Sequence, residues 1–596
     1  MFKRLKPYLW KYRVYWISGF VLVILKNLFQ STGPQLVREA IDTLAPGTDP
    51  STFPLYNQII HSVELQLGVA IVVAYIAAYL LVELLHGIFL YLMRQTLIVM
   101  SRKIEYDLRS DFFSHLQKLH VQFFQYAKTG DLMSRLTNDL ANVREVLGPG
   151  IMYTANTIVA FIYVVPMMIH ISPMLTLLAF LPLFLLSFAV GRLSGVIMTR
   201  SQKVQEKLSD ISSAAQENFS GIRVVKSFVQ EAAEIKKFEN LSHEYIQLNM
   251  SMVRIRGIMM SSVILTIGLS VAVLLWYGGS LVIDGVMSIG EFTAFNFYLA
   301  MLIWPMVAVG WVINIFQRGS ASMKRMNAIF DEQPAISDKN NQSNGHSDIA
   351  GKIEFRNLNF SYRDIPVLKN ISICIHPGMT LGIVGATGSG KSTLVNLIPR
   401  LYDIPDGMLF IDDRDINTIP VSILRQHIGM VTQDNFLFSD TIYQNIVFGV
   451  DNPPTDKVIW AVDTAQLRSN IEDFPEKYET IIGERGITLS GGQKQRLSIA
   501  RAVIREPKIL ILDDALSSVD THTEDEILKR LKILMKNRTT LLVSHRIQTV
   551  KHADLIIVLK EGAIIETGTH DDLVEQNGTY AAMHECQLLE EEVANI

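Results

Sequence analysis

The chain has 596 residues, 49% of them hydrophobic, and a formal net charge of −4. This length predicts two to four domains, and the nearly balanced charge gives no indication of nucleic-acid binding. The two cysteines, Cys374 and Cys586, are too few for a disulfide framework and fit a reducing compartment. Apolar runs fill much of residues 1–320, whereas the remainder has the composition of a soluble α/β protein.

Six apolar segments in the first half are long enough to cross a bilayer, which takes about 20 residues of helix. They lie at residues 14–36, 67–93, 147–170, 173–195, 257–283 and 291–315. The connections after the second and fourth segments are long and carry most of the Lys and Arg, which marks them as cytosolic. The sequence therefore predicts an all-α, six-helix membrane domain over residues 1–330, with a cytosolic N-terminus.

The two long connections keep helical spacing and contain few Gly or Pro, as in RKIEYDLRSDFFSHLQKL. Folded as antiparallel arms of about 25 residues, they would extend roughly 40 Å from the membrane. Aromatic and small polar residues combine at their tips, HVQFFQYAKTGDL (120–132) and SSAAQENFSGIRVVKSF (212–228). Phe123, Phe124 and Phe219 are compatible with packing inside the arms, but we favour docking of these tips onto the soluble half.

Ionisable residues interrupt two of the predicted spans: Lys26 in the first, and Glu83 and His86 one helical turn apart in the second. Such groups are costly in lipid and usually face a cavity or a partner. These three residues are equally compatible with contact to a substrate and with a structural polar cluster. For Lys26, snorkelling to the membrane surface is a further alternative. Aromatic residues of the last span suit a cavity for amphipathic compounds and equally suit helix packing.

A polar segment, DEQPAISDKNNQSNGHSDIA, has the composition of a linker at residues 331–350. After it, residues 351–590 are predicted to form an α/β domain. An apolar strand there leads into GATGSGKS (385–392), which matches G-x-x-x-x-G-K-[ST] and opens an apolar helix. In such a loop the backbone N–H groups surround phosphate oxygens, the lysine reaches the β- and γ-phosphates, and the serine ligates Mg²⁺. The predicted phosphate-binding residues are Gly385, Ala386, Thr387, Gly388, Ser389, Gly390, Lys391, Ser392 and Thr393.

Further polar residues follow apolar strands. Asp513 ends the run ILIL and is placed to hold the metal together with Ser392. Gln433 and His545 stand after two other apolar strands, where we favour contacts with the metal or γ-phosphate over a structural role. A second Gly-rich turn opens a helix in LSGGQ (489–493), so that Ser490, Gly491, Gly492 and Gln493 form another anion-binding end.

Together, GATGSGKS, LSGGQ, LDDALSSVD and SHR occur in the order found in ABC transporters of the exporter type. The chain resembles such a protein over essentially its whole length, with one membrane domain fused to one P-loop nucleotide-binding domain. The resemblance implies that ATP is bound between the glycine loop of one chain and the LSGGQ of another, so the working unit is a dimer. It also implies that Tyr362 stacks on adenine, that Glu484 contacts the arms, and that Asp520 lies at the dimer interface.

Similar proteins usually carry Glu directly after the metal-site Asp, and that Glu orients or deprotonates the attacking water. Here the residue is Asp514, which is one methylene shorter. A retreat of about 1 Å can cost about a hundredfold in rate, so binding of ATP is expected to survive while hydrolysis is slow. The stretch LDDALSSVD is similar to one subunit of bacterial heterodimeric multidrug-type exporters, although His545 is intact here. We favour a heterodimer, and a homodimer remains an alternative.

The function implied by the resemblance is ATP-driven export of hydrophobic or amphipathic compounds from the cytosol or inner leaflet. ATP and Mg²⁺ are the expected cofactors. The expected partners are a second half-transporter, the transported compound and membrane lipid, with no nucleic acid. The expected location is the bacterial cytoplasmic membrane, with the linker and nucleotide-binding domain in the cytosol. Alternatives are a homodimeric flippase for lipid A-like lipids and a non-transporting ATP-gated regulator. The sequence does not identify the substrate or the partner chain.

Overall fold

The computed structural model describes residues 2–44, 71–338, 348–483, 489–519 and 521–594. The chain divides into two compact units. The first comprises Met1–Gln117 and Thr129–Glu332, and the second comprises Lys118–Lys128 and Gln333–Ile596. Of the predicted linker, 331–350, residues 339–347 lie outside the described ranges.

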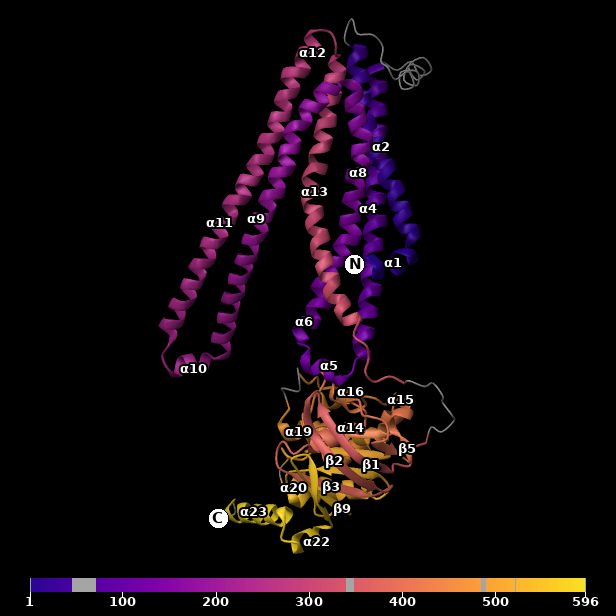
Figure 1. Ribbon diagram of the computed structural model, residues 1–596, viewed down its shortest axis with the longest axis vertical. Helices are drawn as coiled ribbons and strands as arrows, with labels where there is room; N and C mark the ends of the chain where they lie inside the picture. Colours follow the sequence, from indigo (N-terminus) through magenta and orange to yellow (C-terminus); the bar gives the residue numbers. More distant parts are fainter. Residues whose placement is uncertain (1, 45–70, 339–347, 484–488, 520, 595–596) are drawn as a thin grey trace. The chain divides into compact units, whose positions relative to one another are not determined.

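The described secondary structure elements of the first unit are all helices (Figure 1). Its helices are α1 (Phe2–Lys11), α2 (Arg13–Leu44), α4 (Ile71–Lys118), α6 (Thr129–Ser134), α7 (Leu140–Glu145), α8 (Ile151–Ile171), α9 (Pro173–Ser220), α10 (Ile222–Ser227), α11 (Glu231–Val273), α12 (Gly279–Ile283) and α13 (Ile289–Phe330). Three π-helical turns connect consecutive α-helices directly, so that the helical backbone continues through them. They are η1 (Arg135–Asp139), η2 (Val146–Gly150) and η3 (Leu274–Gly278).

Five described helical stretches are long and apolar enough to cross a membrane, judged by length and composition. They are Arg13–Thr43, Ile71–Lys118, Thr129–Ile171, Glu231–Ile283 and Ile289–Phe330. These stretches contain the described parts of five predicted spans. The sixth predicted span, 173–195, lies within the continuous helix α9, where the apolar stretch found is Pro173–Pro182. Several side chains between 183 and 194 are outside the described set, so this span remains a prediction.

The longest helices are the predicted arms. Helices α4 and α9 have 48 residues each, which corresponds to about 72 Å at 1.5 Å per residue. Because the hydrocarbon core is about 30 Å thick, roughly 40 Å of such a helix extends beyond it, as expected from the sequence. Helices α9 and α11 lie side by side and are joined at the tip by α10 (Figure 1).

A stripe of buried polar side chains follows one side of α2, within and beyond the apolar segment predicted at 14–36. Its members are Lys26, Asn27, Ser31, Gln35, Arg38, Glu39 and Asp42. Lys26 Nζ donates hydrogen bonds to Gln30 and to Asn156 Oδ1 of α8, the latter at 3.2 Å, and Asn27 Nδ2 donates to the same oxygen at 3.1 Å. Since lipid offers no alternative partners, these bonds join α2 to α8, and Lys26 belongs to a structural cluster and does not snorkel.

The second ionisable pair lies within α4. His86 Nδ1 is 3.1 Å from Glu83 Oε2, and His86 Nε2 is buried with no hydrogen-bond partner among the described residues. The pair therefore satisfies one imidazole nitrogen and leaves the other without a partner.

The C-terminal end of α2 holds the beginning of α13. Asp42 accepts hydrogen bonds from Gly290 N at 3.0 Å and Ser288 Oγ at 2.8 Å, and Arg38 Nη2 donates to Glu291 Oε1 at 2.8 Å. A Cβ on Gly290 would lie 2.4 Å from the carbonyl oxygen of Arg38. Only glycine therefore permits this approach between the two helices.

We expect Gly290→Ala to lower the free energy of unfolding by about 1–3 kcal/mol, because backbone in close contact cannot yield without strain. Thermal unfolding of the purified protein in detergent measures this as a lower midpoint. Gly279→Ala is the matched control, because a Cβ on Gly279 meets nothing within 4 Å. Equal midpoints for the two variants would contradict the expectation.

The second unit is an α/β domain with two sheets. Its strands are β1 (Ile353–Tyr362), β2 (Ile365–Ile375), β3 (Thr380–Gly385), β4 (Leu409–Ile411), β5 (Arg414–Asp415), β6 (Ile428–Val431), β7 (Ile509–Asp513), β8 (Thr539–Val543), β9 (Leu555–Lys560) and β10 (Ala563–Gly568). Its helices are α5 (Val121–Tyr126), α14 (Lys391–Leu397), α15 (Val421–Gln426), α16 (Ile442–Ile446), α17 (Thr455–Thr464), α18 (Arg468–Glu472), α19 (Gly491–Val503), α20 (Thr521–Met535), α21 (Ile547–Val550), α22 (His570–Glu575) and α23 (Thr579–Ala594).

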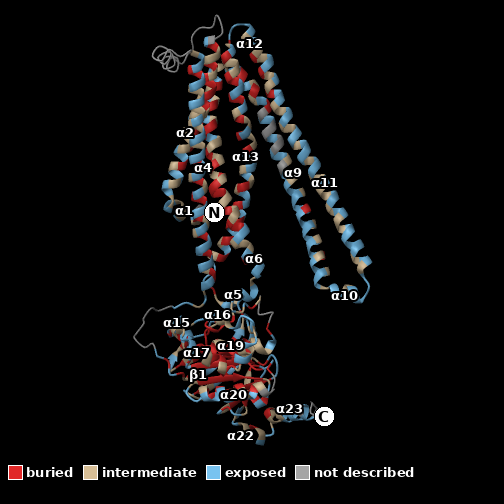
Figure 2. Ribbon diagram, turned by 180° about the vertical axis from the view of Figure 1, so that it is seen from behind, coloured by how far each residue is buried: buried red, intermediate tan, exposed pale blue. Residues whose placement is uncertain are grey.

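The larger sheet positions the site. Its strand order is β10-β9-β3-β8-β7-β6, and the five strands from β9 to β6 are parallel. Every residue of β3, β7 and β8 is buried, and the buried residues concentrate around this sheet within the unit (Figure 2). Parallel strands covered on both faces read as continuous apolar runs, and their carboxyl ends meet at one edge. The predicted fold class, a helical membrane domain followed by an α/β domain, is confirmed.

One arm tip packs in the second unit. Helix α5 belongs to that unit. Gln125 Nε2 donates to Tyr402 OH at 2.6 Å, and the guanidinium of Arg363 lies 3.6 Å from the ring centroid of Tyr126. Docking of this tip was expected, but these contacts come from Gln125 and Tyr126, whereas Phe123 and Phe124 pack edge-on against each other. At the other tip, which belongs to the first unit, the Phe219 side chain is 77% exposed within this chain.

Candidate nucleotide-binding site

The glycine loop lies between β3 and α14 and needs glycine at particular positions. Gly388 and Gly390 have φ angles of +82° and +102°, which favour glycine. A Cβ on Gly385 would lie 2.2 Å from the carbonyl oxygen of Leu559, so this residue also has no room for a side chain. The buried hydroxyl of Ser389 has no hydrogen-bond partner among the described residues. The loop is therefore a tight turn with an unused polar group, which fits a phosphate oxygen.

Two side chains that follow the loop are held by neighbouring oxygens. Lys391 Nζ donates to the carbonyl oxygens of Gly385 at 2.8 Å and Ala386 at 3.0 Å. Burial lowers the pKa of Lys391, and the nearby carboxylates of Asp514 and Asp513 oppose this shift. Ser392 Oγ donates to Asp513 Oδ1 at 3.1 Å. A hydroxyl and a carboxylate in contact are hard oxygen donors, so they fit Mg²⁺.

Asp513 ends β7 and is buried. Burial raises the pKa of its carboxyl group, while the hydrogen bond from Ser392 lowers it. Desolvation disfavours the charged carboxylate, and a cation bound beside it would reverse that balance. This is the electrostatic environment expected of a metal ligand.

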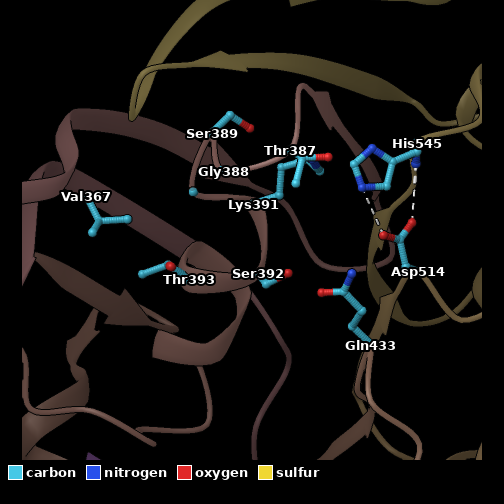
Figure 3. A pocket seen from close by; sticks show the side chains of 11 residues that line it. Val367, Thr387, Gly388, Ser389, Lys391, Ser392, Thr393, Gln433, Asp514 and His545 are labelled. Atoms are coloured by element: carbon cyan, nitrogen blue, oxygen red, sulfur yellow. Dashed lines mark hydrogen bonds and ion pairs between the residues drawn. The ribbon is translucent and has the colours of Figure 1, made fainter. Parts of the chain in front are cut away.

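A cavity of about 260 Å³ opens beside the loop (Figure 3). Gln433, Asp514 and His545 face Lys391 and Ser392 across it (Figure 3). Its lining residues are Val367, Thr387, Gly388, Ser389, Gly390, Lys391, Ser392, Thr393, Gln433, Asp514 and His545. Ten of these eleven were predicted from the sequence to belong to the site, and Val367 was not.

Asp514 is held in an unusual position. It follows the end of β7 with a φ of +48°, a left-handed conformation that Asp tolerates better than most residues. Its Oδ1 accepts a hydrogen bond from the backbone N of His545 at 3.3 Å, and its Oδ2 lies 3.2 Å from His545 Nε2 (Figure 3). Both carboxylate oxygens therefore contact one residue, and neither is directed toward the loop by a bond.

The predicted adenine platform is part of an aromatic group. Tyr362 OH donates to Thr393 Oγ1 at 3.3 Å, and its ring packs edge-on against Phe360 and Tyr402 at centroid distances of 5.1 and 5.2 Å. Burial raises the pKa of Tyr402 to about 12, so its hydroxyl is protonated at neutral pH. Because Tyr402 also accepts the bond from Gln125, it connects α5 to Tyr362. No sequence pattern indicates this connection, because Gln125 lies 277 positions from Tyr402 in the chain.

We expect Tyr402→Phe to weaken the coupling between α5 and the nucleotide site by about fivefold, the equivalent of one hydrogen bond of about 1 kcal/mol. The measurement is the stimulation of ATP turnover by transported compounds in proteoliposomes. Gln125→Leu should give the same loss, and the double variant should lose no more than either single variant. Additive losses would show that the two side chains act separately.

The second anion-binding surface lies at the start of α19. Ser490 Oγ accepts from Gln493 N at 3.2 Å, and Gln493 Oε1 accepts from Ser490 N at 2.9 Å, which forms a capping box. None of the residues 490–493 lines the cavity beside the glycine loop. The two predicted phosphate-binding surfaces are therefore separate within one chain.

Gln495, one turn further along α19, was missed. Its Nε2 donates to the carbonyl oxygen of Asp514 at 3.2 Å and to Ser517 Oγ at 2.8 Å, and its Oε1 accepts from Ser518 N at 2.8 Å. It thus joins the LSGGQ helix to the segment that follows the candidate base.

Two residues that were predicted from the resemblance, Glu484 and Asp520, lie outside the described residues.

Comparison with known proteins gives matches in both halves of the chain. Residues 16–306 match the family "ABC transporter transmembrane region", and residues 368–517 match the family "ABC transporter". A solved structure described as a bacterial Atm1-family ABC exporter with ATP bound is similar with a TM-score of 0.78 and 26% identity, over 96% of this chain and 98% of that chain.

Three curated relatives extend over most of the chain. The probable multidrug resistance ABC transporter ATP-binding/permease protein YheI of Bacillus subtilis (strain 168) is 34% identical, over 99% of this chain and 98% of that protein. The multidrug resistance-like ATP-binding protein MdlA of Escherichia coli (strain K12) is 33% identical, over 98% of this chain and 96% of that protein. The ATP-dependent lipid A-core flippase of Syntrophus aciditrophicus (strain SB) is 35% identical, over 87% of this chain and 86% of that protein.

Proposed function

The chain belongs to the ABC transporters, as an exporter half-transporter, and on that premise we propose that it exports hydrophobic or amphipathic compounds as one half of a heterodimer. Membership makes it an integral membrane protein that couples ATP hydrolysis to transport and works as a dimer. The observation that carries the asymmetric part of the proposal is Asp514, a short carboxylate whose two oxygens both contact His545. The bacterial cytoplasmic membrane is the proposed location, with the N-terminus, linker and nucleotide-binding domain in the cytosol.

ATP is proposed to bind in the cavity beside the glycine loop, with the adenine ring against Tyr362 and the phosphates at residues 385–393. Lys391 would exchange the carbonyl oxygens of Gly385 and Ala386 for phosphate oxygens. Ser392, Gln433 and Asp513 would hold Mg²⁺, Asp513 through water. When bound, the ion neutralises charge between the β- and γ-phosphates.

Hydrolysis at this loop requires a group that orients or deprotonates the attacking water, and Asp514 is the residue in that position. It is shorter than glutamate, and its oxygens are engaged by His545. A candidate base needs hydrogen-bond reach of the water, and we propose that the shorter side chain of Asp514, held by His545, does not provide it. We therefore assign this site to ATP binding with slow turnover, in which His545 holds Asp514 and contacts the γ-phosphate.

A second chain would explain why the two anion-binding surfaces of this chain are separate. Ser490–Gln493 of this chain would complete the nucleotide site of the partner, and a partner with Glu in the base position would hydrolyse ATP there. An exposed apolar arm tip also supports a second chain: Phe219, Phe228 and Val229 are exposed around α10. Contiguous exposed apolar residues of this kind mark interaction surfaces.

The heterodimer is tested by comparing two variants of this chain in its complex with the Glu-bearing partner, purified from native membranes and reconstituted in lipid. Ser490→Arg should lower ATP turnover to about a tenth or less, because a large side chain replaces the hydroxyl that would donate to phosphate in the partner's working site. Asp514→Asn should leave turnover within about twofold, because it changes a site that contributes little chemistry. A homodimer would lose turnover in both variants.

Lipid transport is the second candidate for the cargo, because a lipid A-core flippase is among the relatives, beside multidrug-type relatives. The discriminating experiment uses proteoliposomes that contain the complex and ATP. Uphill accumulation of an amphipathic fluorescent dye supports drug export. Movement of labelled lipid between leaflets without dye accumulation supports the flippase.

A further inference from the structure

The C-terminal helix α23 contacts the segment around His545 through one side chain, Gln587. Gln587 Oε1 accepts a hydrogen bond from the backbone N of Ile547 at 2.8 Å. Its Nε2 donates to the carbonyl oxygen of His545 at 2.6 Å. The two bonds bracket Arg546, so one amide fixes the peptide groups on both sides of that residue. We propose that Gln587 is a positioning residue that sets the orientation of His545 in the nucleotide site.

The position of His545 matters because it makes both contacts with Asp514. Its backbone N lies 3.3 Å from Asp514 Oδ1, and its Nε2 lies 3.2 Å from Asp514 Oδ2. A change in the backbone angles of His545 therefore moves the candidate γ-phosphate contact and the candidate base together. Reacting groups need placement within about 0.5 Å, and errors of about 1 Å can cost a hundredfold in rate.

Other bonds to this segment come from different residues. The backbone N of Arg546 donates to Ser544 Oγ at 2.9 Å, within the segment itself. Arg546 Nη1 is paired with Glu524 Oε2 at 2.5 Å, and Thr549 Oγ1 donates to Glu524 Oε1 at 2.7 Å. Both bonds to Glu524 run to α20 and involve side chains of the segment, so they do not hold the carbonyl group of His545. Within the described residues, the side-chain bond to the His545 carbonyl comes from Gln587. The C-terminal helix thus supplies a constraint that α20 does not.

A purely structural role for Gln587, as an anchor of α23, is the simpler alternative. The helix has separate anchors at its beginning, however. The backbone N atoms of Thr579 and Tyr580 donate to Glu566 at 2.6 and 3.0 Å, and the fully buried Tyr580 contacts His570 Nδ1 through its hydroxyl at 2.8 Å. Gln587 lies about two turns beyond these contacts, so its loss is not expected to detach the helix.

Hydrogen exchange on the full-length chain in lipid tests the proposal directly. In Gln587→Met, which keeps the length of the side chain and removes both bonds, we expect the amide of Ile547 to exchange at least about fivefold faster. Gln587→Glu keeps the acceptor for that amide and loses the donated bond, so it should show a smaller rise. Peptides from β9 and from 579–583 should not change. Glu590→Ala, an exposed position on the same helix, is the control and should leave exchange at Ile547 unaltered.

Turnover gives the second readout and rests on the proposed role of Asp514, so it is measured in an Asp514→Glu background. In that background, Gln587→Met should lower kcat about tenfold and should change the KM for ATP by no more than about twofold. The kcat of Gln587→Glu should lie between those of Gln587→Met and the Asp514→Glu parent. Unchanged exchange at Ile547, or equal increases in β9 and α23, would overturn the positioning role. If Asp514→Glu itself fails to raise turnover, the proposed function fails while the exchange data still decide the role of Gln587.

Discussion

Asp514→Glu is expected to raise the ATP turnover of this chain, reconstituted alone in lipid, by about a hundredfold. The added methylene moves the carboxylate about 1 Å further from the backbone, toward the water that it has to activate. It also changes the geometry with His545, which holds both oxygens of the native side chain. The measurement is the steady-state rate of phosphate release at saturating ATP, with the KM for ATP followed in parallel.

Asp513→Glu is the matched control, because it adds the same methylene one residue earlier. It lengthens the side chain that contacts Ser392 and is expected to lower turnover, since it disturbs the candidate metal site. Fast turnover of the native chain, unaltered by Asp514→Glu, would mean that the short carboxylate suffices. The homodimer would then replace the heterodimer as the working unit.

Lys391→Ala is expected to weaken ATP binding by about a thousandfold and to abolish transport. The ammonium group of Lys391 would make two charge-assisted bonds to phosphate oxygens, each worth about 1.5–3 kcal/mol. No other Lys or Arg side chain lines the cavity among the described residues. Equilibrium binding of a fluorescent ATP analogue to the reconstituted protein measures the loss.

Two further variants define the specificity of that result. Lys391→Arg keeps the charge but not the shape, so it should bind ATP with intermediate affinity. Lys536→Ala removes an exposed lysine that does not line the cavity beside the glycine loop and should bind as the native chain does. Unchanged nucleotide binding and transport in Lys391→Ala would refute the assignment of the glycine loop.

The candidate site residues that the sequence predicts, and that the structure brings close together, are explained by local features of the chain. The glycine loop, Lys391 and Ser392 are consecutive, and their conformation follows from the glycine spacing. Asp513, Asp514, Gln433 and His545 each follow an apolar run, and parallel strands bring such positions to one edge of a sheet. Helical periodicity and charge likewise predicted the arms. In all of these cases, a short stretch of sequence contains the residues that determine the structure.

The features that were missed depend on residues far apart in the chain. Tyr402 acquires its role from Gln125, 277 positions away, and Gln587 acquires its role from His545, 42 positions away. Apart from Lys26, the polar stripe on α2 was not predicted, because its members lie among apolar residues and bond to other helices, including α8 and α13. Docking of the first arm tip was predicted from the combination of aromatic and small polar residues there, with Phe123 and Phe124 as the aromatic residues. Hydrogen bonding and a cation–π contact selected their neighbours, Gln125 and Tyr126.

The polar stripe on α2 has a consequence for how the protein is made. Asn156, which bonds to Lys26 and Asn27, is synthesised about 130 residues later. At 5–20 residues per second, the first span waits roughly 6–26 s for that partner. A lysine near the centre of a span costs about 2.5–3.5 kcal/mol during insertion, and α2 is the least hydrophobic of the five apolar stretches. We therefore expect the first span to become fully stable in lipid only after the third span, which carries Asn156, has been made.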